Sequence, residues 1–292
     1  MRGAFVAIVG GLTVLAAAAA CNELEGFSGG DPLDGGGTSD GVGGGGNDAD
    51  TTGDGGAQTD AGGNGCPTGR GPTMVRVGKF CIDSTEITQK QFLDFTQATG
   101  GDTSGQPPEC AWNTEYGAGC GFNPNAKPDY PVEAMDWCDA VAYCKWAGKR
   151  LCGAPGDPAT KPSSAIPATT TNAWLTACTG GGSLAYPYGE FYDPNACNGA
   201  DYVEAGAAAV PVGSMKTCQG GYPGIYDMTG NVFEWIQFCD PNTADAGPGA
   251  DTCFVAGGNY QQGKDGQRCA YQHGYARNFK YCGFGFRCCA DL

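Results

Sequence analysis

Histidine is almost absent from this chain of 292 residues, which has His273 and no other. One imidazole cannot form the histidine clusters that hold zinc or non-haem iron, and it leaves no catalytic triad of the usual kind. Because His273 lies between Gln272 and Gly274, we expect it in a surface loop.

Positive charge is also scarce. The 16 Lys and Arg face 31 Asp and Glu, which gives a formal net charge of -15. Residues 22–65 contribute -9 of this and Arg2 contributes +1, so residues 66–292 keep -7. No basic stripe offsets this acidity, and the sequence therefore excludes nucleic acid as a partner. No Gly-rich run follows a strand and opens a helix, so phosphate binding has no support either.

The chain has one long apolar run, at its beginning. A basic residue at position 2 precedes an apolar segment that ends in five alanines, which is typical of a signal peptide over residues 1–20. Cys21 follows directly, and we expect it to carry a lipid that anchors the protein to a membrane. The alternative is ordinary secretion after an Ala-x-Ala cut, with Cys21 unpaired. Asn22 favours the outer membrane or cell surface, by analogy with lipoprotein sorting.

Residues 22–65 have few apolar side chains from which a hydrophobic core could form. They include 17 Gly and nine Asp or Glu among 44 residues. Such a segment cannot bury enough surface to offset its ordering entropy. As a Gly-rich coil it would span roughly 35 Å root-mean-square. We therefore predict a lipidated cysteine and a disordered tether over residues 21–65, followed by one domain over residues 66–292.

Cysteine is abundant, with 17 in the chain. Reduced cytosol would not keep so many thiols paired, so the protein is expected in an oxidising, extracytoplasmic compartment. Without Cys21 the count is 16, an even number that can form bridges throughout. The domain is otherwise rich in Gly, Pro and aromatic residues, which predicts much loop, short strands and two or three helices.

Three helices are indicated by capping and periodicity. The first covers residues 88–99, where Thr88 and Gln91 form a capping box and Gly100 is a stop signal. The second covers residues 136–147, with Asp136 as its N-cap. A third, shorter helix is expected around residues 174–178, after Thr171 or Asn172. Residues 153–170 form a Pro- and Ala-rich insertion.

A series of short motifs runs in a fixed order through the domain. They are DWCDAVAYC (136–144), WAGKRL (146–151), WLTAC (174–178), YPYG (186–189), PVGS (211–214), GIYDMTGNVFEW (224–235), GGN (257–259) and GFRC (285–288). Together they resemble the formylglycine-generating enzyme, or sulfatase-modifying-factor, family over approximately residues 74–289. The resemblance implies the loop-rich α+β variant of the C-type-lectin-like fold, with short antiparallel strands and many disulfides. It does not by itself imply the reaction.

The resemblance also implies two disulfides, Cys144–Cys288 and Cys178–Cys269. The adjacent Cys289 leaves the choice at Cys288 open. Short spacings suggest two more bridges, Cys110–Cys120 and Cys239–Cys253, and Cys282 with Cys289 would form a local pair, although connectivity cannot be fixed from sequence.

The family's copper site is expected to be missing. In similar enzymes two thiolates hold Cu(I), which prefers polarisable sulfur. Counting from Gly257, those cysteines map to Gln262 and Gln267, and the accompanying serine maps to Asn259. Amides do not replace thiolates, so copper is not expected and no catalytic residue is assigned.

Calcium fits the pattern better. The resemblance implies a site made by the carboxylates of Asp227 and Glu234 with the carbonyls of Gly230 and Val232, oxygen donors that Ca²⁺ prefers. The alternative is a purely structural turn at Gly230. A second site maps to Asn198, Gly199, Glu204 and Gly206, with Glu in place of the family's Asp.

The function expected from the sequence is that of a membrane-anchored, non-catalytic binding or structural module with a peptide, protein or glycan ligand. A formylglycine-generating oxidase with unconventional thiols is the first alternative. A carbohydrate-binding module is the second, since aromatic side chains could stack on a sugar or simply pack. These are Tyr186, Tyr188, Phe191 and Tyr192.

Overall fold

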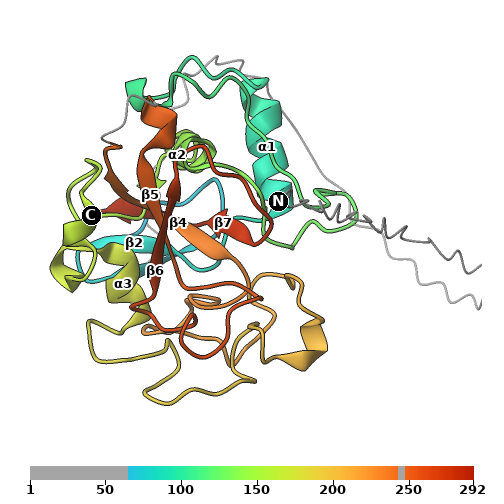
Figure 1. Ribbon diagram of the computed structural model, residues 1–292, viewed down its shortest axis with the longest axis vertical. Helices are drawn as coiled ribbons and strands as arrows, with labels where there is room; N and C mark the ends of the chain where they lie inside the picture. Colours follow the sequence, from blue (N-terminus) through green and yellow to red (C-terminus); the bar gives the residue numbers. More distant parts are fainter. Residues whose placement is uncertain (1–64, 243–246) are drawn as a thin grey trace, which may run out of the picture. The chain divides into compact units, whose positions relative to one another are not determined.

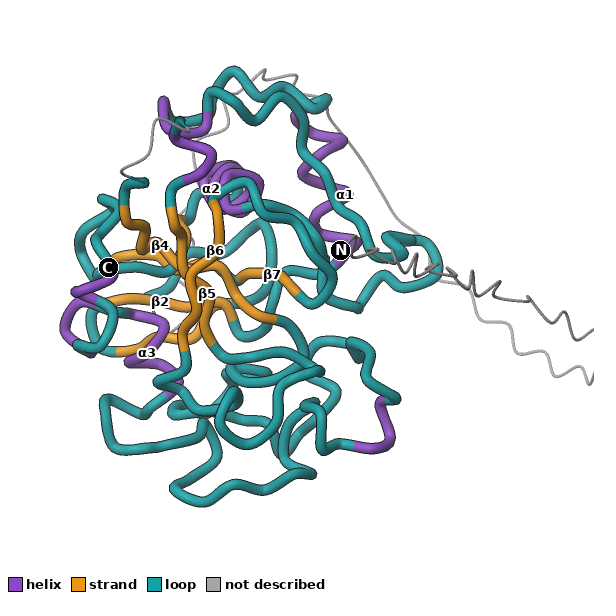
Figure 2. Tube along the Cα trace, in the orientation of Figure 1, coloured by secondary structure: helices purple, strands orange, loops and turns teal. Residues whose placement is uncertain are grey.

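The computed structural model describes residues 65–242 and 247–292, which belong to the unit Asp54–Leu292 (Figure 1). The predicted signal peptide, Cys21 and the predicted tether up to residue 64 lie outside the described residues. None of the helices in the described part has the length and apolar character needed to cross a membrane. Loops and turns dominate, and the fold is the loop-rich α+β type that was predicted (Figure 2).

The three predicted helices are confirmed, each with the expected cap. Helix α1 (Gln89–Thr99) begins after Thr88, whose side chain forms the capping box with Gln91, and ends at the left-handed Gly100. Helix α2 (Trp137–Trp146) is capped by Asp136, and α3 (Ala173–Cys178) by Asn172. Single 3-10 turns lie at Pro108–Cys110, Ser163–Ala165, Thr169–Thr171, Val203–Ala205 and Pro248–Ala250.

One four-stranded antiparallel sheet joins the two ends of the domain. Its order is β1 (Met74–Val77), β2 (Phe80–Asp83), β8 (Cys288–Asp291) and β3 (Arg150–Leu151). Strand β2 is buried along its whole length, because β1 and β8 flank it and apolar side chains cover it.

The second sheet has the order β6 (Gln272–Ala276), β5 (Thr252–Ala256), β4 (Phe233–Asp240) and β7 (Phe284–Phe286). Strand β7 pairs with β4 in parallel. The prediction of antiparallel strands is therefore wrong for this pair, because the chain returns to β4 only after the long excursion through β5 and β6. A single residue, Arg287, separates β7 from β8, so the chain passes there from one sheet to the other.

The long loop between α3 and β4 lies on the far side of β5 and β6 from α1 and α2, whereas the loop between α1 and α2 stays beside these helices (Figure 1). Two buried clusters fill the domain. In the first, α1 meets α2 through aromatic rings, with Phe95 and Tyr143 edge to face at 5.6 Å between centroids. In the second, Trp174 of α3 packs among apolar side chains of both sheets. The helices and strands thus form a frame from which the loops project.

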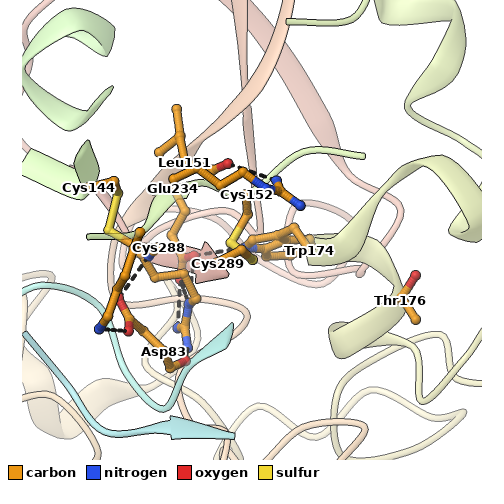
Figure 3. Close-up of a disulfide and its surroundings, with 12 residues drawn as sticks. Asp83, Cys144, Leu151, Cys152, Trp174, Thr176, Glu234, Cys288 and Cys289 are labelled. Atoms are coloured by element: carbon orange, nitrogen blue, oxygen red, sulfur yellow. Dashed lines mark hydrogen bonds and ion pairs between the residues drawn. A yellow bond between two sulfur atoms is a disulfide. The ribbon is translucent and has the colours of Figure 1, made fainter. Parts of the chain in front are cut away.

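All 16 cysteines of the described residues form disulfides. The bridges are Cys66–Cys81, Cys110–Cys138, Cys120–Cys282, Cys144–Cys288, Cys152–Cys289, Cys178–Cys269, Cys197–Cys218 and Cys239–Cys253. The adjacent cysteines of β8 reach to opposite sides, one toward α2 and one toward the residue after β3 (Figure 3). Three predicted bridges agree with the structure: Cys144–Cys288, Cys178–Cys269 and Cys239–Cys253.

Two predicted pairings are wrong. Cys110 pairs with Cys138 and not with Cys120, because its 3-10 turn packs against the first turn of α2. Cys282 pairs with Cys120 and not with Cys289, because neighbouring residues 288 and 289 of β8 are already committed to other elements. Proximity in sequence is a poor guide where loops cross the whole domain.

Candidate functional site

A tight glycine turn after β5 positions the segment where similar enzymes hold copper. Gly257 has φ +86°, and a Cβ there would lie 2.5 Å from the carbonyl oxygen of Met228. Gly258 has φ +69°, and its Cβ would meet the carbonyl of Gly266 at 2.4 Å. Only glycine fits both positions without displacing backbone. The turn therefore fixes residues 259–267 against the body of the domain.

Asn259 occupies the position of the family serine and is fully embedded. Its side-chain Nδ2 donates to the carbonyl of Gly283 at 3.4 Å, and its Oδ1 accepts from the Gln261 N–H at 2.9 Å. A Cβ on Gly283 would come within 2.3 Å of this amide. Asn259 thus ties the turn to the segment before β7, which is a structural use of the position.

The two positions mapped to copper cysteines behave differently. Gln267 is buried, and its Nε2 donates to the Gln262 carbonyl at 2.9 Å. A Cβ on Gly199 would lie 1.2 Å from that Nε2, so the long amide fits only because residue 199 is glycine. Gln262 is half-buried and faces a cavity. The Gln267 amide bonds to the Gln262 carbonyl between the two positions. Neither position has a thiolate, so there is no pair of sulfur donors to bind Cu(I).

Free thiols cannot substitute among the described residues, because every cysteine there is in a bridge. Disulfide sulfur is not a thiolate and does not bind copper as one. The donor set around Asn259 therefore does not fit the metal that the family resemblance implies.

Above this segment lies an aromatic cavity of about 240 Å³. It is lined by Phe233, Asn259, Gln261, Gln262, Tyr275, Phe279, Tyr281 and Phe284. No charged side chain lines it. Rings supply apolar surface, and the amides supply both hydrogen-bond donors and acceptors. Pockets of this composition hold uncharged, partly apolar groups. We call it the aromatic cavity.

A second cavity of about 410 Å³ adjoins the first and shares Tyr281 with it. Its lining is Glu115, Gly117, Ala118, Gly119, Cys120, Ala134, Lys280, Tyr281 and Cys282. We call it the disulfide cavity, because Cys120 and Cys282 are bonded to each other in its wall. Tyr281 lines both cavities and is 55% exposed, so its side chain can contact a ligand in either one.

Glu133 is buried and bonds to residues next to the cavity linings. Its carboxylate accepts from the Gly283 N–H at 2.6 Å and from the Tyr260 hydroxyl at 3.5 Å. Burial raises the pKa of Glu133. Burial and the charge of Glu133 together raise the pKa of Tyr260 to about 12. The tyrosine hydroxyl therefore stays protonated and serves as a donor, while Glu133 anchors the segment that carries Tyr281.

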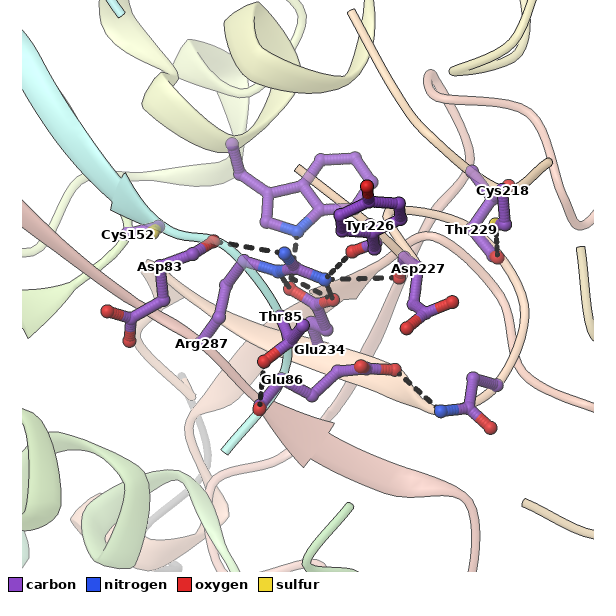
Figure 4. Close-up of polar contacts among 12 residues, drawn as sticks. Asp83, Thr85, Glu86, Cys152, Cys218, Tyr226, Asp227, Thr229, Glu234 and Arg287 are labelled. Atoms are coloured by element: carbon purple, nitrogen blue, oxygen red, sulfur yellow. Dashed lines mark hydrogen bonds and ion pairs between the residues drawn. The ribbon is translucent and has the colours of Figure 1, made fainter. Parts of the chain in front are cut away.

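The predicted calcium ligands of the 227–234 turn are otherwise engaged. Both oxygens of Glu234 accept from Arg287, at 2.7–2.9 Å, and the Trp174 indole donates to one of them at 2.7 Å (Figure 4). Asp227 accepts from the Gly213 N–H at 2.5 Å. A guanidinium in bidentate contact already neutralises Glu234 and repels a second cation. These residues do not fit calcium as arranged.

Besides Asp83, whose carboxylate pairs with Lys149, the same region holds three buried carboxyl groups and one guanidinium (Figure 4). Burial raises the pKa of Asp227 to about 6. Burial, followed by the charge of Asp227, raises the pKa of Glu86 well above its usual range. One Glu86 oxygen accepts from Asn231 at 3.0 Å and the other has no partner among the described residues. Arg287 balances Glu234, so Glu86 and Asp227 hold protons more tightly than exposed carboxyl groups do.

The second predicted calcium site is also incomplete. Asn198 is buried, and its Oδ1 has no hydrogen-bond partner in the described part of the chain. Glu204, however, is exposed and accepts from the Tyr202 hydroxyl at 2.9 Å. Gly199 packs on Gln267, and Gly206 is an exposed left-handed residue after a 3-10 turn. One buried oxygen without a carboxylate beside it does not make a calcium cage.

The aromatic residues predicted to stack on a sugar or to pack differ in burial. Tyr186 is buried, and the Tyr188 ring stacks on it at 5.6 Å between centroids. Tyr192 donates to Asp201 at 2.7 Å, and Phe191 is 88% exposed. His273 is exposed as predicted, but it lies in strand β6 and not in a loop.

The cavity walls were not found by sequence reasoning. Tyr275, Phe279, Tyr281 and Phe284 were not singled out, although aromatic residues recur every few positions between residues 271 and 286. That density was the available signal. The rings pack on one another, as Phe279 does on Tyr275 at 4.9 Å between centroids. Their gathering depends on how β6 and β7 are placed at the two edges of one sheet, which no local pattern encodes.

The fold and this altered centre define a formylglycine-generating-enzyme-like domain without the sulfur pair. The family described as sulfatase-modifying factor enzyme 1-like domain matches residues 44–292, and the chain belongs to it. The match begins within the predicted tether. Among solved structures, PvdO from Pseudomonas aeruginosa has a TM-score of 0.51 at 21% identity, over 73% of this chain and 80% of that one, which shows the fold alone.

Curated relatives differ in what they are named for. The chain is 32% identical to a formylglycine-generating enzyme of Thermomonospora curvata and 28% identical to the inactive C-alpha-formylglycine-generating enzyme 2 of Bos taurus, each over 57% of this chain and 62% of the relative. It is 27% identical to serine/threonine-protein kinase Pkn1 of Chlamydia trachomatis, over 73% of this chain and 33% of the relative. The chain thus spans a third to three fifths of these relatives' length.

Proposed function

We propose that this chain is an extracytoplasmic, lipid-anchored protein whose domain binds a ligand and does not oxidise cysteine. The observation that carries this proposal is the replacement of the sulfur pair by Gln262 and Gln267, with Gln267 sealed against Gly199. Chemistry of the family type needs thiolate donors, and the amides cannot supply them. The scaffold around the replaced centre is intact and bears an open cavity.

The aromatic cavity is the proposed ligand site. Its lining carries no charge, so a phosphate, a carboxylate or an ammonium group would lose hydration there without gaining a partner. An uncharged group with both donors and acceptors matches the amides, and its apolar face matches the rings. An uncharged peptide segment and a neutral glycan both satisfy this chemistry. The adjoining disulfide cavity gives an extended ligand a continuation past Tyr281.

Two supports come from outside the cavity. One relative at 28% identity is named as an inactive formylglycine-generating enzyme, which shows that the family contains members so described. The identity to a relative named as active is similar, so the names do not decide the matter. The cysteine content supports an oxidising compartment, and all 16 described cysteines are oxidised.

The experiment for the absence of oxidase activity uses copper-loaded protein and a sulfatase-type cysteine peptide under air. Mass spectrometry should find no conversion of cysteine to the aldehyde. A triple variant, Asn259→Ser with Gln262→Cys and Gln267→Cys, tests whether the amides are the reason, through Cu(I) binding followed by competition with a chelator. Aldehyde formation by the unaltered chain would establish the oxidase alternative and refute the proposal.

Binding is tested with neutral glycan and peptide arrays, on which Phe279→Ala should remove the signal of the unaltered domain. Phe191→Ala is the matched control, because this ring is 88% exposed and lies outside the cavity. Retention that is equal in both variants would contradict the cavity assignment.

The predicted lipid anchor is tested by incorporation of a palmitate analogue, which Cys21→Ser should abolish.

A further inference from the structure

One of the eight disulfides differs from the others in exposure. Cys120 is exposed and Cys282 is half-buried, whereas the other fourteen described cysteines are each at most 8% exposed. Exchange requires that a thiolate reach a sulfur atom, so access selects which bridge reacts. Of the bridges in the described part of the chain, Cys120–Cys282 alone meets this condition in the folded state.

The bridge is also placed where a thiol-bearing molecule can be held. Both cysteines line the disulfide cavity of about 410 Å³, which is large enough for a short peptide or a tripeptide thiol. Glu115 gives its lining an acidic side chain, which can meet the ammonium end of such a molecule, whereas the Lys280 ammonium is already paired with Asp136 and Asp139 at 3.2 and 3.1 Å. The neighbouring bridges lack this setting, since their cysteines lie in the core.

The two half-cystines are held together by more than their covalent bond. The Gly119 N–H donates to the Glu133 carbonyl at 3.0 Å, and the Gly283 N–H donates to the Glu133 carboxylate at 2.6 Å. One residue therefore anchors the immediate neighbours of both cysteines. If the bridge is reduced, these bonds keep the two thiols near each other. Such an arrangement favours reversible exchange over unfolding of the loop.

We propose that Cys120–Cys282 is a thiol-exchange site that takes thiol-bearing peptides or small thiols as its substrate class. A thiolate in the cavity attacks Sγ of the exposed Cys120, a new S–S bond forms, and the old one breaks. The electron pair leaves on Sγ of Cys282, which takes a proton from water. A second thiol then attacks the mixed disulfide, so two thiols are oxidised to one disulfide while the bridge becomes a dithiol.

Exchange at this bridge would also reach the aromatic cavity. Tyr281, next to Cys282, lines both cavities. Reduction removes the covalent tie at Cys282, next to Tyr281, and leaves the Gly283–Glu133 hydrogen bond one residue further along the chain. The redox state of the bridge therefore bears on how firmly this wall is held, independently of whether the proposed ligand is a glycan or a peptide.

The test uses the folded full chain in graded concentrations of reduced glutathione, followed by rapid maleimide labelling and peptide mapping. Cys120 and Cys282 should be labelled at least about tenfold faster than any other cysteine, since buried bridges must wait for local opening. A cysteine-containing peptide used as a second probe should leave a mixed disulfide on Cys120. Labelling that begins at another bridge, or at all bridges together, would overturn the assignment.

Two variants test whether the early labelling comes from this pair and whether Glu133 holds the two thiols together. With Cys120→Ser and Cys282→Ser combined, the remaining seven bridges should stay unlabelled under the same conditions, which shows that the early signal comes from this pair. Glu133→Gln changes the anchoring carboxylate, and reoxidation of the reduced pair should slow severalfold with the initial labelling rate unchanged. Reoxidation at the unaltered rate would refute the role given to Glu133.

Discussion

At the scale of single residues, the altered centre is a matched pair of substitutions. Gln267 is longer than the cysteine that similar enzymes carry, and its amide occupies the space beside Gly199. Its Nε2 is bonded to the Gln262 carbonyl, while its Oε1 has no partner among the described residues. The fit is therefore steric more than polar. Gln267 therefore makes a position that holds a reactive cysteine in similar enzymes part of the buried core.

This fit predicts a rescue between two positions. Gly199→Ala should destabilise the domain by about 1–3 kcal/mol, because its Cβ would overlap the Gln267 amide. Adding Gln267→Ala should recover part of that loss by vacating the space of the amide, while the approach of the Cβ to the Gln262 carbonyl oxygen at 2.8 Å remains. A double-mutant cycle in urea unfolding measures this coupling. Gly105→Ala, where a Cβ meets nothing within 4 Å, is the control. Additive losses would show that the two residues do not compete for one volume.

At the scale of elements, the two neighbouring disulfides of β8 connect the same two segments of the chain. Cys144–Cys288 and Cys152–Cys289 start eight residues apart and end on adjacent residues. With one bridge present, the other closes only a short additional loop. The entropy that each removes from the unfolded chain is therefore not independent of the other.

Removal of either bridge alone by paired Cys→Ala changes should cost about 3 kcal/mol or less. Removal of both should cost more than the sum, since the second loss frees a far longer loop, with sequence separations of 144 and 137 residues for the two bridges. Urea unfolding of the two double variants and the quadruple variant measures this. If the quadruple variant loses only the sum of the two single-bridge losses in free energy of unfolding, or less, the two disulfides do not constrain the same loop.

Local elements were predictable where their signals are local. The caps Thr88 and Asp136 fixed two helix starts to the residue, because a capping box needs only four neighbouring residues. The bridge Cys110–Cys138 was not predictable, since it depends on how a 3-10 turn packs on α2. Parallel pairing of β4 with β7 was missed for the same reason. Contacts between distant segments leave little trace in any short window of sequence.

At the scale of the whole molecule, the site was predictable in part. The absence of sulfur at residues 262 and 267 could be seen in the sequence, and the structure adds that one amide is sealed and the other faces a cavity. The predicted calcium donors had the right chemistry. They are engaged because Arg287, at the junction of the two sheets, reaches Glu234 across 53 residues of sequence. Charge compensation of this kind is a property of the folded whole.

The buried carboxyl groups give the whole domain an unusual dependence on pH. The pKa of Asp227 is raised by burial from 3.8 to about 6, with Glu86, Glu234 and Arg287 around it. Between these two values the folded state holds a proton that the unfolded state releases. Stability from this group is therefore full below about pH 4 and is lost as the pH rises through 6. The pKa of Asp291 is lowered by its bonds to Arg150, which acts in the opposite direction at lower pH.

The free energy of unfolding should therefore peak near pH 4 and fall on the order of 1–3 kcal/mol by pH 7. Asp227→Asn keeps an acceptor for the Gly213 N–H and cannot ionise, so it should flatten this fall and raise stability at pH 7. Urea unfolding across pH 3.5–8 with disulfides intact measures both effects. Glu190→Gln is the control, because that side chain is exposed. A stability that rises from pH 4 to 7 would mean that Glu86 and Asp227 do not retain a proton when buried together.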